Sequence, residues 1–182
     1  MSGRLFLFDP ADRFIVGTVG MPGERTFFIQ ARSGGRLISV SLEKAQVAAL
    51  ADRIEQIIRE VRRSEPLTQI DRVSRDEKPL ETPIDEEFRV GVIGLAYVSD
   101  RHLIEIDLQA MADGVSSEDE EVLEEISEGQ DILRVLITLG YAEAFARRAN
   151  SVVNAGRAPC PFCGGPIDPA GHLCPRANGY RR

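Results

Sequence analysis

Residues 13–20, RFIVGTVG, have a near copy 74 residues later, at residues 87–94, EFRVGVIG. Both stretches have Phe and Val two positions apart and Gly at the same two positions. Apolar residues at alternate positions are typical of a β-strand with one buried face, and glycine inside a strand marks a bulge, a bend or the close approach of another backbone. We therefore expect each half of the chain to open with a similar strand, with chance similarity as the alternative.

Each of these strands is followed by two further strand-like segments and one amphipathic helix. Residues 43–63 and 140–154 have apolar residues at three- and four-residue steps, the spacing of a helix with one buried face. Ser41 and Thr138 are candidate N-caps of these helices. The strand-like segments between are residues 25–31, 36–42, 102–111 and 133–138. The pattern predicts an α+β fold of two pseudo-repeated β-β-β-α lobes.

The last part of the chain concentrates its metal-binding residue types. Residues 160–175, CPFCGGPIDPAGHLCP, hold all three cysteines and one of the two histidines. Two residues between thiols let both sulfurs reach one ion, and the following glycines allow a tight turn. The spacing predicts a structural Zn²⁺ site in a short zinc-ribbon-like knuckle; its ligands are Cys160, Cys163, His172 and Cys174.

Two other interpretations of this segment were weighed. Redox-active thiols in an unstructured tail would explain the cysteines, but not the turn residues and the histidine between them. A catalytic zinc usually keeps one position open, whereas four donors are present here. We therefore expect a metal that holds the tail in shape.

The sequence divides into four parts. Residues 1–63 form the first lobe; residues 64–85, with three prolines, have the composition of a linker. Residues 86–156 form the second lobe, and residues 157–182 form the zinc-binding tail. Within the second lobe, residues 113–131 carry nine acidic residues and no Lys or Arg. This insertion is read as a solvated surface, with a docking face for a basic partner as the alternative.

The segments PCPFCGGPIDPAGHLCPRANGYRR, DRFIVGTVGMPGERTFFIQ and EEFRVGVIGLAY resemble an uncharacterised family of actinobacterial conserved hypothetical proteins. The resemblance covers the chain except residues 64–80 and the acidic insertion. It implies a set of three proteins encoded together, of which the others are similar to a histidine-phosphatase-type phosphoglycerate mutase and to a lipid kinase. A phosphatase-like or kinase-like protein of the same pathway is the partner that the resemblance implies.

No catalytic constellation stands out in the sequence. There is no P-loop motif, the Gly pairs open no helix, and His102 is expected to be a surface or turn histidine. We assign no catalytic residue. One polar group, at a strand end that carries glycine, is a candidate site for a phosphate or carboxylate: Arg13, Arg25, Gln30 and Arg89. A plain hairpin turn with surface arginines is the alternative.

Composition and charge argue against some of the remaining functional classes of protein. The net charge of −7 and the low aromatic content of 6% disfavour a nucleic-acid-binding protein. No apolar run has the length of a membrane span, and no signal peptide is evident, so a cytoplasmic location is expected. The leading hypothesis is a non-enzymatic interaction or regulatory module with a structural zinc. The alternative is an enzyme or ligand-sensing domain for a small phosphorylated compound in the groove between the lobes.

Overall fold

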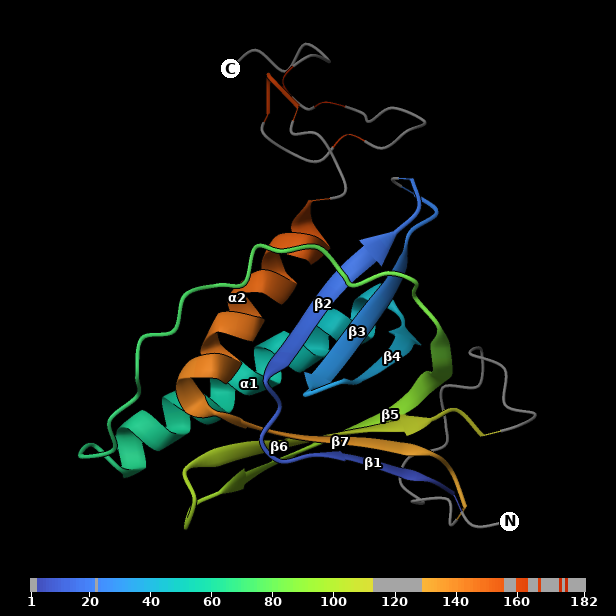
Figure 1. The fold of residues 1–182 in the computed structure, drawn as a ribbon. Helices are drawn as coiled ribbons and strands as arrows, with labels where there is room; N and C mark the ends of the chain where they lie inside the picture. The colour runs from blue at the N-terminus through green and yellow to red at the C-terminus, as the bar shows by residue number, and fades with distance from the viewer. Residues whose placement is uncertain are drawn as a thin grey trace.

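A computed structural model describes residues 3–21, 23–112, 129–155, 160–163, 167, 174 and 176. Its strands are β1 (Leu5–Phe8), β2 (Arg13–Val19), β3 (Thr26–Ser33), β4 (Arg36–Leu42), β5 (Glu86–Val98), β6 (Leu103–Ala110) and β7 (Ile132–Thr138). Its helices are α1 (Lys44–Ser64) and α2 (Leu139–Asn154). The predicted α+β fold is confirmed, because β2-β3-β4-α1 and β5-β6-β7-α2 follow one another as two β-β-β-α units (Figure 1).

All seven strands belong to one sheet, in the order β1-β7-β6-β5-β4-β3-β2. Neighbouring strands are antiparallel except at β4–β5 and β1–β7, which are parallel. The β4–β5 ladder joins the two units and pairs only Ser39 with Glu86, Val40 with Phe88 and Ser41 with Arg89. Figure 1 shows that β2 and β3 run at a steep angle to β6 and β7, so the sheet bends sharply at this short ladder.

The repeated strands β2 and β5 direct their matching Phe and Val residues toward the shared core. Phe14 and Val16 on β2 are buried, and Val90 on β5 is buried while Phe88 packs against the same core. The glycine that follows the valine allows close contact in both copies. A Cβ on Gly17 would lie 2.6 Å from the side chain of Leu80, and a Cβ on Gly91 would lie 2.8 Å from the Met111 backbone. The register shifts between Val90 and Val92, so Gly91 marks a bulge, one of the three features that glycine inside a strand indicates. The pairing of β2 with β3 is continuous at Gly17.

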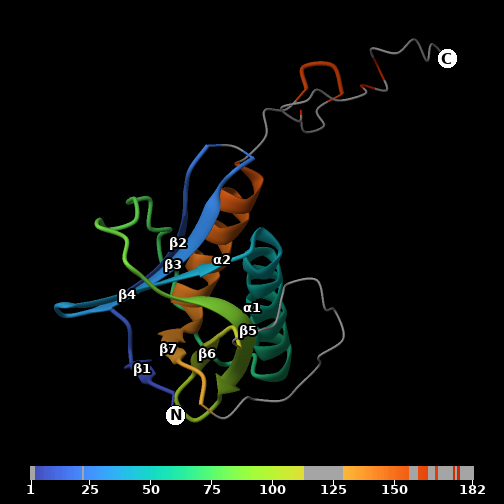
Figure 2. The same ribbon diagram turned by 90° about the vertical axis from the view of Figure 1, so that its right-hand side faces the viewer.

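The two helices lie side by side and pack against the sheet (Figure 2). The face of α1 that is buried consists of apolar residues at helical spacing: Val47, Leu50, Ala51, Ile54, Ile57, Ile58 and Val61. These residues and the apolar face of α2 join side chains from both β-β-β-α units in one hydrophobic cluster. The two units therefore share a single core.

The helix starts differ in how well the sequence predicted them. Thr138 caps α2, since its side chain accepts a hydrogen bond from Tyr141 N at 3.2 Å. The prediction for Ser41 was wrong: the N-cap of α1 is Glu43, whose N–H donates to the side chain of Gln46 at 2.8 Å. Ser41 remains inside β4, and its hydroxyl donates to Glu86 at 2.7 Å.

Residues 65–85 contain no helix or strand. Residues 71–76 run along α2, where Arg147 and Arg148 donate to the carbonyl oxygens of Val73 and Asp76, and residues 80–81 lie on the sheet face opposite the helices. On that face, Gln30 is only 2% exposed because its amide exchanges two hydrogen bonds with the backbone of Glu81. Leu80 fills the space over Gly17. Figure 1 shows the same segment crossing α2 and β2. Residues 80–81 thus form a third layer over β2 and β3.

Candidate functional site

The three cysteines meet at one point. The sulfur atoms of Cys160, Cys163 and Cys174 lie within 4.8 Å of one another, and those of Cys160 and Cys174 are 3.8 Å apart. All three are free thiols, and they are the only cysteines in the chain. Three thiols at this separation can hold one metal ion.

A tight turn at residues 160–163 directs backbone N–H groups at the sulfur of Cys160. The backbone N–H groups of Cys163 and Phe162 donate to the Cys160 sulfur, and the bond from Cys163 does most to hold the pKa of that thiol below its ordinary value. Amide donors stabilise the negative charge of a thiolate. The thiolate is the form that binds metal, so the turn favours the protonation state that a metal centre needs.

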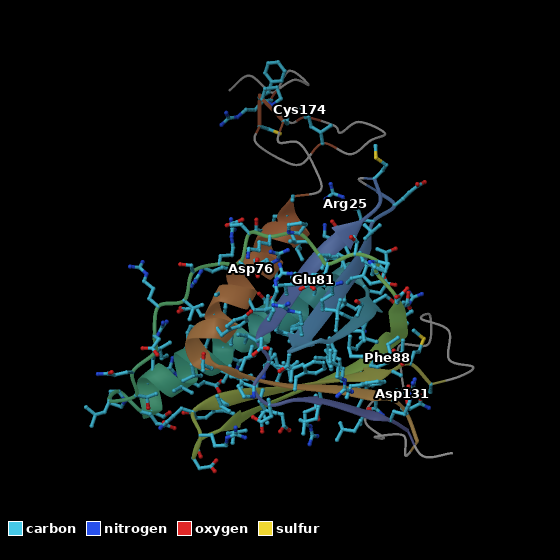
Figure 3. The ribbon with its side chains drawn as sticks, in the orientation of Figure 1. Arg25, Asp76, Glu81, Phe88, Asp131 and Cys174 are labelled. Atoms are coloured by element: carbon cyan, nitrogen blue, oxygen red, sulfur yellow. The ribbon has the colours of Figure 1, made fainter. Side chains whose placement is uncertain are left out.

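Two of the three cysteines are shielded from water, although the cluster is not part of the main core. Cys160 is 6% exposed and Cys174 is 8% exposed, yet the hydrophobic cluster of sheet and helices includes neither. Figure 3 shows Cys174 beyond the carboxyl end of α2. The guanidinium of Arg176 donates to the carbonyl oxygen of Phe162 at 3.2 Å, which ties the end of the knuckle to its first turn.

Two predicted features fall on parts of the chain outside the described residues. His172, the predicted fourth ligand, is one of them. The other is the acidic insertion predicted at residues 113–131, of which the structure describes residues 129–131.

The structure brings together two of the four polar candidates, Arg13 and Gln30. Arg13 binds Asp76 through two hydrogen bonds of 2.6 and 3.1 Å and Glu81 through one of 3.2 Å. It also donates to the carbonyl oxygens of Lys78 and Pro79. Gln30 holds the Glu81 backbone from the neighbouring strand. Both side chains therefore fasten residues 76–81 to the sheet, as Figure 3 shows for Asp76 and Glu81 over β2.

The other two candidates lie elsewhere. Arg25 precedes β3 at the far end of the β2–β3 hairpin, and Figure 3 shows it near the hairpin tip. Arg89 lies on β5, is about half exposed, and pairs with Glu43 at the start of α1. Neither contacts the cluster around Arg13.

Sequence reasoning missed the arginine at the centre of the cluster. Arg148 on α2 is 9% exposed, and burial lowers the pKa of its guanidinium below the ordinary value. Its Nε donates to Val16 O at 2.6 Å, and its Nη1 donates to Asp76 O. The signal was present in the sequence, because position 148 falls on the apolar face of α2, where a charged residue needs dedicated partners.

His102 lies in the turn between β5 and β6, as expected, and its φ of 51° is in the left-handed region. Its Nδ1 is 2.9 Å from the hydroxyl oxygen of Tyr97, and that hydroxyl donates its proton to Glu65 at 3.0 Å.

Among the helices that the structure describes, none is long and apolar enough to cross a membrane. Residues 6–174 match the model of a protein family described as "Protein of unknown function (DUF3090)". No curated protein and no solved structure matches the chain.

Proposed function

The chain belongs to the DUF3090 family of proteins of unknown function, and on that premise we propose that it is a zinc-binding interaction module. Its Zn²⁺ is held by Cys160, Cys163, His172 and Cys174 and has a structural role. The observation that carries the proposal is the convergence of the three sulfurs. The proposed cellular setting is the cytoplasm, where reducing conditions keep thiols available to a metal.

The separation of two sulfurs supports zinc. A tetrahedral ion with Zn–S bonds near 2.3 Å places neighbouring sulfurs about 3.8 Å apart. The sulfurs of Cys160 and Cys174 are 3.8 Å apart. A disulfide would require about 2.05 Å, so the two sulfurs are not an oxidised pair, and their separation is compatible with two ligands of one ion.

His172 is proposed as the fourth ligand because of its position in the sequence. It stands two residues before Cys174, and the chain has no further cysteine to complete a tetrahedral set. Three thiolates and one neutral imidazole leave the centre with a net charge of about −1, which a nearby guanidinium such as that of Arg176 offsets. The donor set is complete without water, which supports a structural role over a catalytic one.

An interaction role follows from the position of the knuckle. A tail this short can build little apolar core, so we expect the metal to provide most of the free energy that orders it. Residues 157–182 have four arginines and one acidic residue, although the whole chain has a net charge of −7. A metal-ordered basic tail suits a protein partner with an acidic face. The first partners to test are the phosphatase-like and kinase-like proteins that the family resemblance implies.

Elemental mass spectrometry of tag-free protein, purified without added metal, tests the metal. We expect about one zinc per chain, and its loss in Cys160→Ser. The free energy of unfolding of the body should stay within about 0.5 kcal/mol of the wild-type value in that variant, because Cys160 does not belong to the shared core. A wild type with no zinc and three titratable thiols would exclude the zinc centre, and loss of cooperative unfolding in Cys160→Ser would show that the knuckle is not local.

The interaction role needs its own test. The full chain and the Cys160→Ser variant, each immobilised, are offered to the purified phosphatase-like and kinase-like proteins. Binding by the wild type that is lost in Cys160→Ser supports a partner that recognises the zinc-ordered tail. Equal binding by both forms would move the interaction to the body of the protein.

A further inference from the structure

A cavity of about 320 Å³ lies where the two β-β-β-α units meet. Its walls come from β2 and β3 of the first unit, from α2 of the second, and from residues 74–78 of the segment that crosses them. Phe14 and Phe145, whose rings stack at a centroid distance of 4.6 Å, contribute to its apolar wall. Of the four polar candidates from the sequence, only Arg13 lines this cavity.

The lining carries more positive than negative charge, in a chain of net charge −7. Four lining side chains are cationic and two are acidic; the cations are Arg13, Arg32, Lys78 and Arg148, and the acids are Asp12 and Asp76. Glu81 pairs with Arg13 and Arg32 and leaves one positive charge in excess. The cavity is therefore electrostatically suited to bind an anion, although the protein as a whole is negatively charged.

The acceptors in the lining are already engaged. The Asp76 carboxylate accepts hydrogen bonds from the guanidinium of Arg13 and, at 2.8 Å, from the backbone N–H of Lys78. Asp12 receives the backbone N–H of Gly34 at 2.7 Å. These carboxylates are thus occupied in holding the walls together.

Several donors in the lining have no acceptor within the part of the chain that the structure describes. Arg32 Nε is buried without a hydrogen-bond partner, and the nearest pairing carboxylate oxygen, on Glu81, is 3.4 Å away. Lys78 uses its backbone in the fold, but its exposed ammonium group makes no ion pair. Tyr141 accepts a hydrogen bond from Phe14 N at 3.0 Å, and its own hydroxyl proton is unused. A buried donor without an acceptor is costly, so the cavity favours a ligand that supplies acceptors.

We propose that this cavity binds the phosphate group of a small phosphomonoester, with Arg32, Lys78, Arg148 and Tyr141 as its donors. The donors come from three directions: a strand, the crossing segment and a helix. A tetrahedral phosphate presents three terminal oxygens and nearly two negative charges, whereas a carboxylate presents two oxygens in one plane and one charge. The arrangement therefore fits phosphate better. The cavity is independent of the metal centre.

Lys78 is the most informative position to substitute in a test of this proposal. Its ammonium group contributes nothing to the fold that the structure describes, so Lys78→Gln should keep the stability of the wild type. Lys44 is the other lysine of the chain, and it lies exposed at the first residue of α1, away from the cavity. Lys44→Gln is thus a control with the same loss of charge. Arg32→Gln is a second variant within the lining.

Isothermal titration calorimetry of the full chain with glycerol 3-phosphate, with inorganic phosphate and with acetate measures the binding. We expect saturable binding of one phosphate compound per chain and weaker binding of acetate. Lys78→Gln and Arg32→Gln should each reduce the affinity about tenfold, the factor that corresponds to one lost charge-assisted hydrogen bond. Lys44→Gln should leave the affinity unchanged.

A further arm separates this cavity from the metal centre. Cys160→Ser should bind glycerol 3-phosphate as the wild type does, even if no zinc is present in either protein. The proposal is overturned if the wild type shows no saturable binding up to about 10 mM, a range that already corresponds to very weak affinity. It is equally overturned if acetate binds as tightly, if Lys78→Gln and Lys44→Gln behave alike, or if Cys160→Ser abolishes binding, since the phosphate would then bind to the metal.

Discussion

Arg148 Nε donates to Val16 O at 2.6 Å, so a helix side chain takes the hydrogen bond that a further strand would otherwise make. β2 is the last strand of the sheet, and on the same strand the backbone N–H of Phe14 donates to the hydroxyl of Tyr141. Unpaired backbone groups along an edge strand are sites of aggregation. In this fold α2 satisfies them, and residues 76–81 lie over the same strand, so the edge is closed from two sides.

Arg148→Ala should destabilise the protein by about 2–4 kcal/mol. The substitution leaves the carbonyl oxygens of Val16 and Asp76 without their donor and removes a buried side chain. Chemical denaturation followed by circular dichroism measures the change. Arg59→Ala is the control, because Arg59 is exposed on α1 and pairs only with Glu55 one turn away among the described residues. It should change the stability by less than about 0.5 kcal/mol. Equal effects of the two substitutions would contradict the role given to Arg148.

Asp76→Asn should make the protein less stable at neutral pH, by about 1–3 kcal/mol, and the difference from wild type should disappear in acid. The hydrogen bond from Arg13 is the main cause that lowers the pKa of Asp76 below its ordinary value of 3.8. The unfolded chain therefore takes up the proton first as the pH falls. The stabilisation from this carboxylate is complete well above pH 3.8 and is lost as the pH falls below that value and through the lower pKa of the folded protein.

Unfolding free energies of wild type and Asp76→Asn, measured between about pH 7 and pH 2, test this dependence. Asp52→Asn is a suitable control, because Asp52 is exposed on α1 and has no hydrogen bond or ion pair in the described part of the chain. A difference between wild type and Asp76→Asn that stays constant over the whole range would show that the Arg13 contact does not depend on the charge of Asp76.

Gly140→Ala should lower the free energy of unfolding by about 1–3 kcal/mol, although alanine is the better helix former by about 1 kcal/mol. A Cβ at position 140 would lie 2.0 Å from the carbonyl oxygen of Asp71, so the crossing segment would have to move away from α2. Gly35→Ala is the matched control, since a Cβ there has nothing within 4 Å. It should be neutral or slightly stabilising. A stabilising Gly140→Ala would show that residues 65–85 are not held against the helix.

The strands of the repeat and both helices were predictable because their apolar periodicity reports burial directly. Val47, Leu50 and Ile54 on α1 are 0–1% exposed, as their spacing predicts. β1 was not predicted, because it has only four residues and its pairing partner β7 lies more than a hundred residues away in the sequence. Ser41 was taken for a cap because its residue type favours that role, but strand pairing with β5 continues through it. Tertiary pairing overrides local preference in both cases.

The same limit applies to the polar residues. The knuckle could be predicted because Cys160, Cys163 and Cys174 are close in the sequence and share one chemistry. Arg13 and Gln30 both bind residues 76–81, and the sequence does not show this contact between distant segments. The cavity beside Arg148 depends on that same meeting of distant segments, so it could be described only from the fold.

His172→Asn should lower the affinity for zinc by at least about tenfold, whereas His102→Asn should not change it. The chain has two histidines. His172 stands between the cysteines of the knuckle, while His102 lies in the β5–β6 turn and contacts Tyr97. Each substitution therefore removes one imidazole. His172→Asn removes it from a proposed ligand position, and His102→Asn removes it from a position outside the metal centre. Competition with a chromogenic zinc chelator measures both affinities on the full chain. A large loss of zinc affinity in His102→Asn would contradict the control. Unchanged zinc affinity in His172→Asn would remove His172 from the proposed ligand set and leave a centre of three thiolates with one position open. Such a position would admit water or a substrate, and a catalytic role for the metal would then become the better hypothesis.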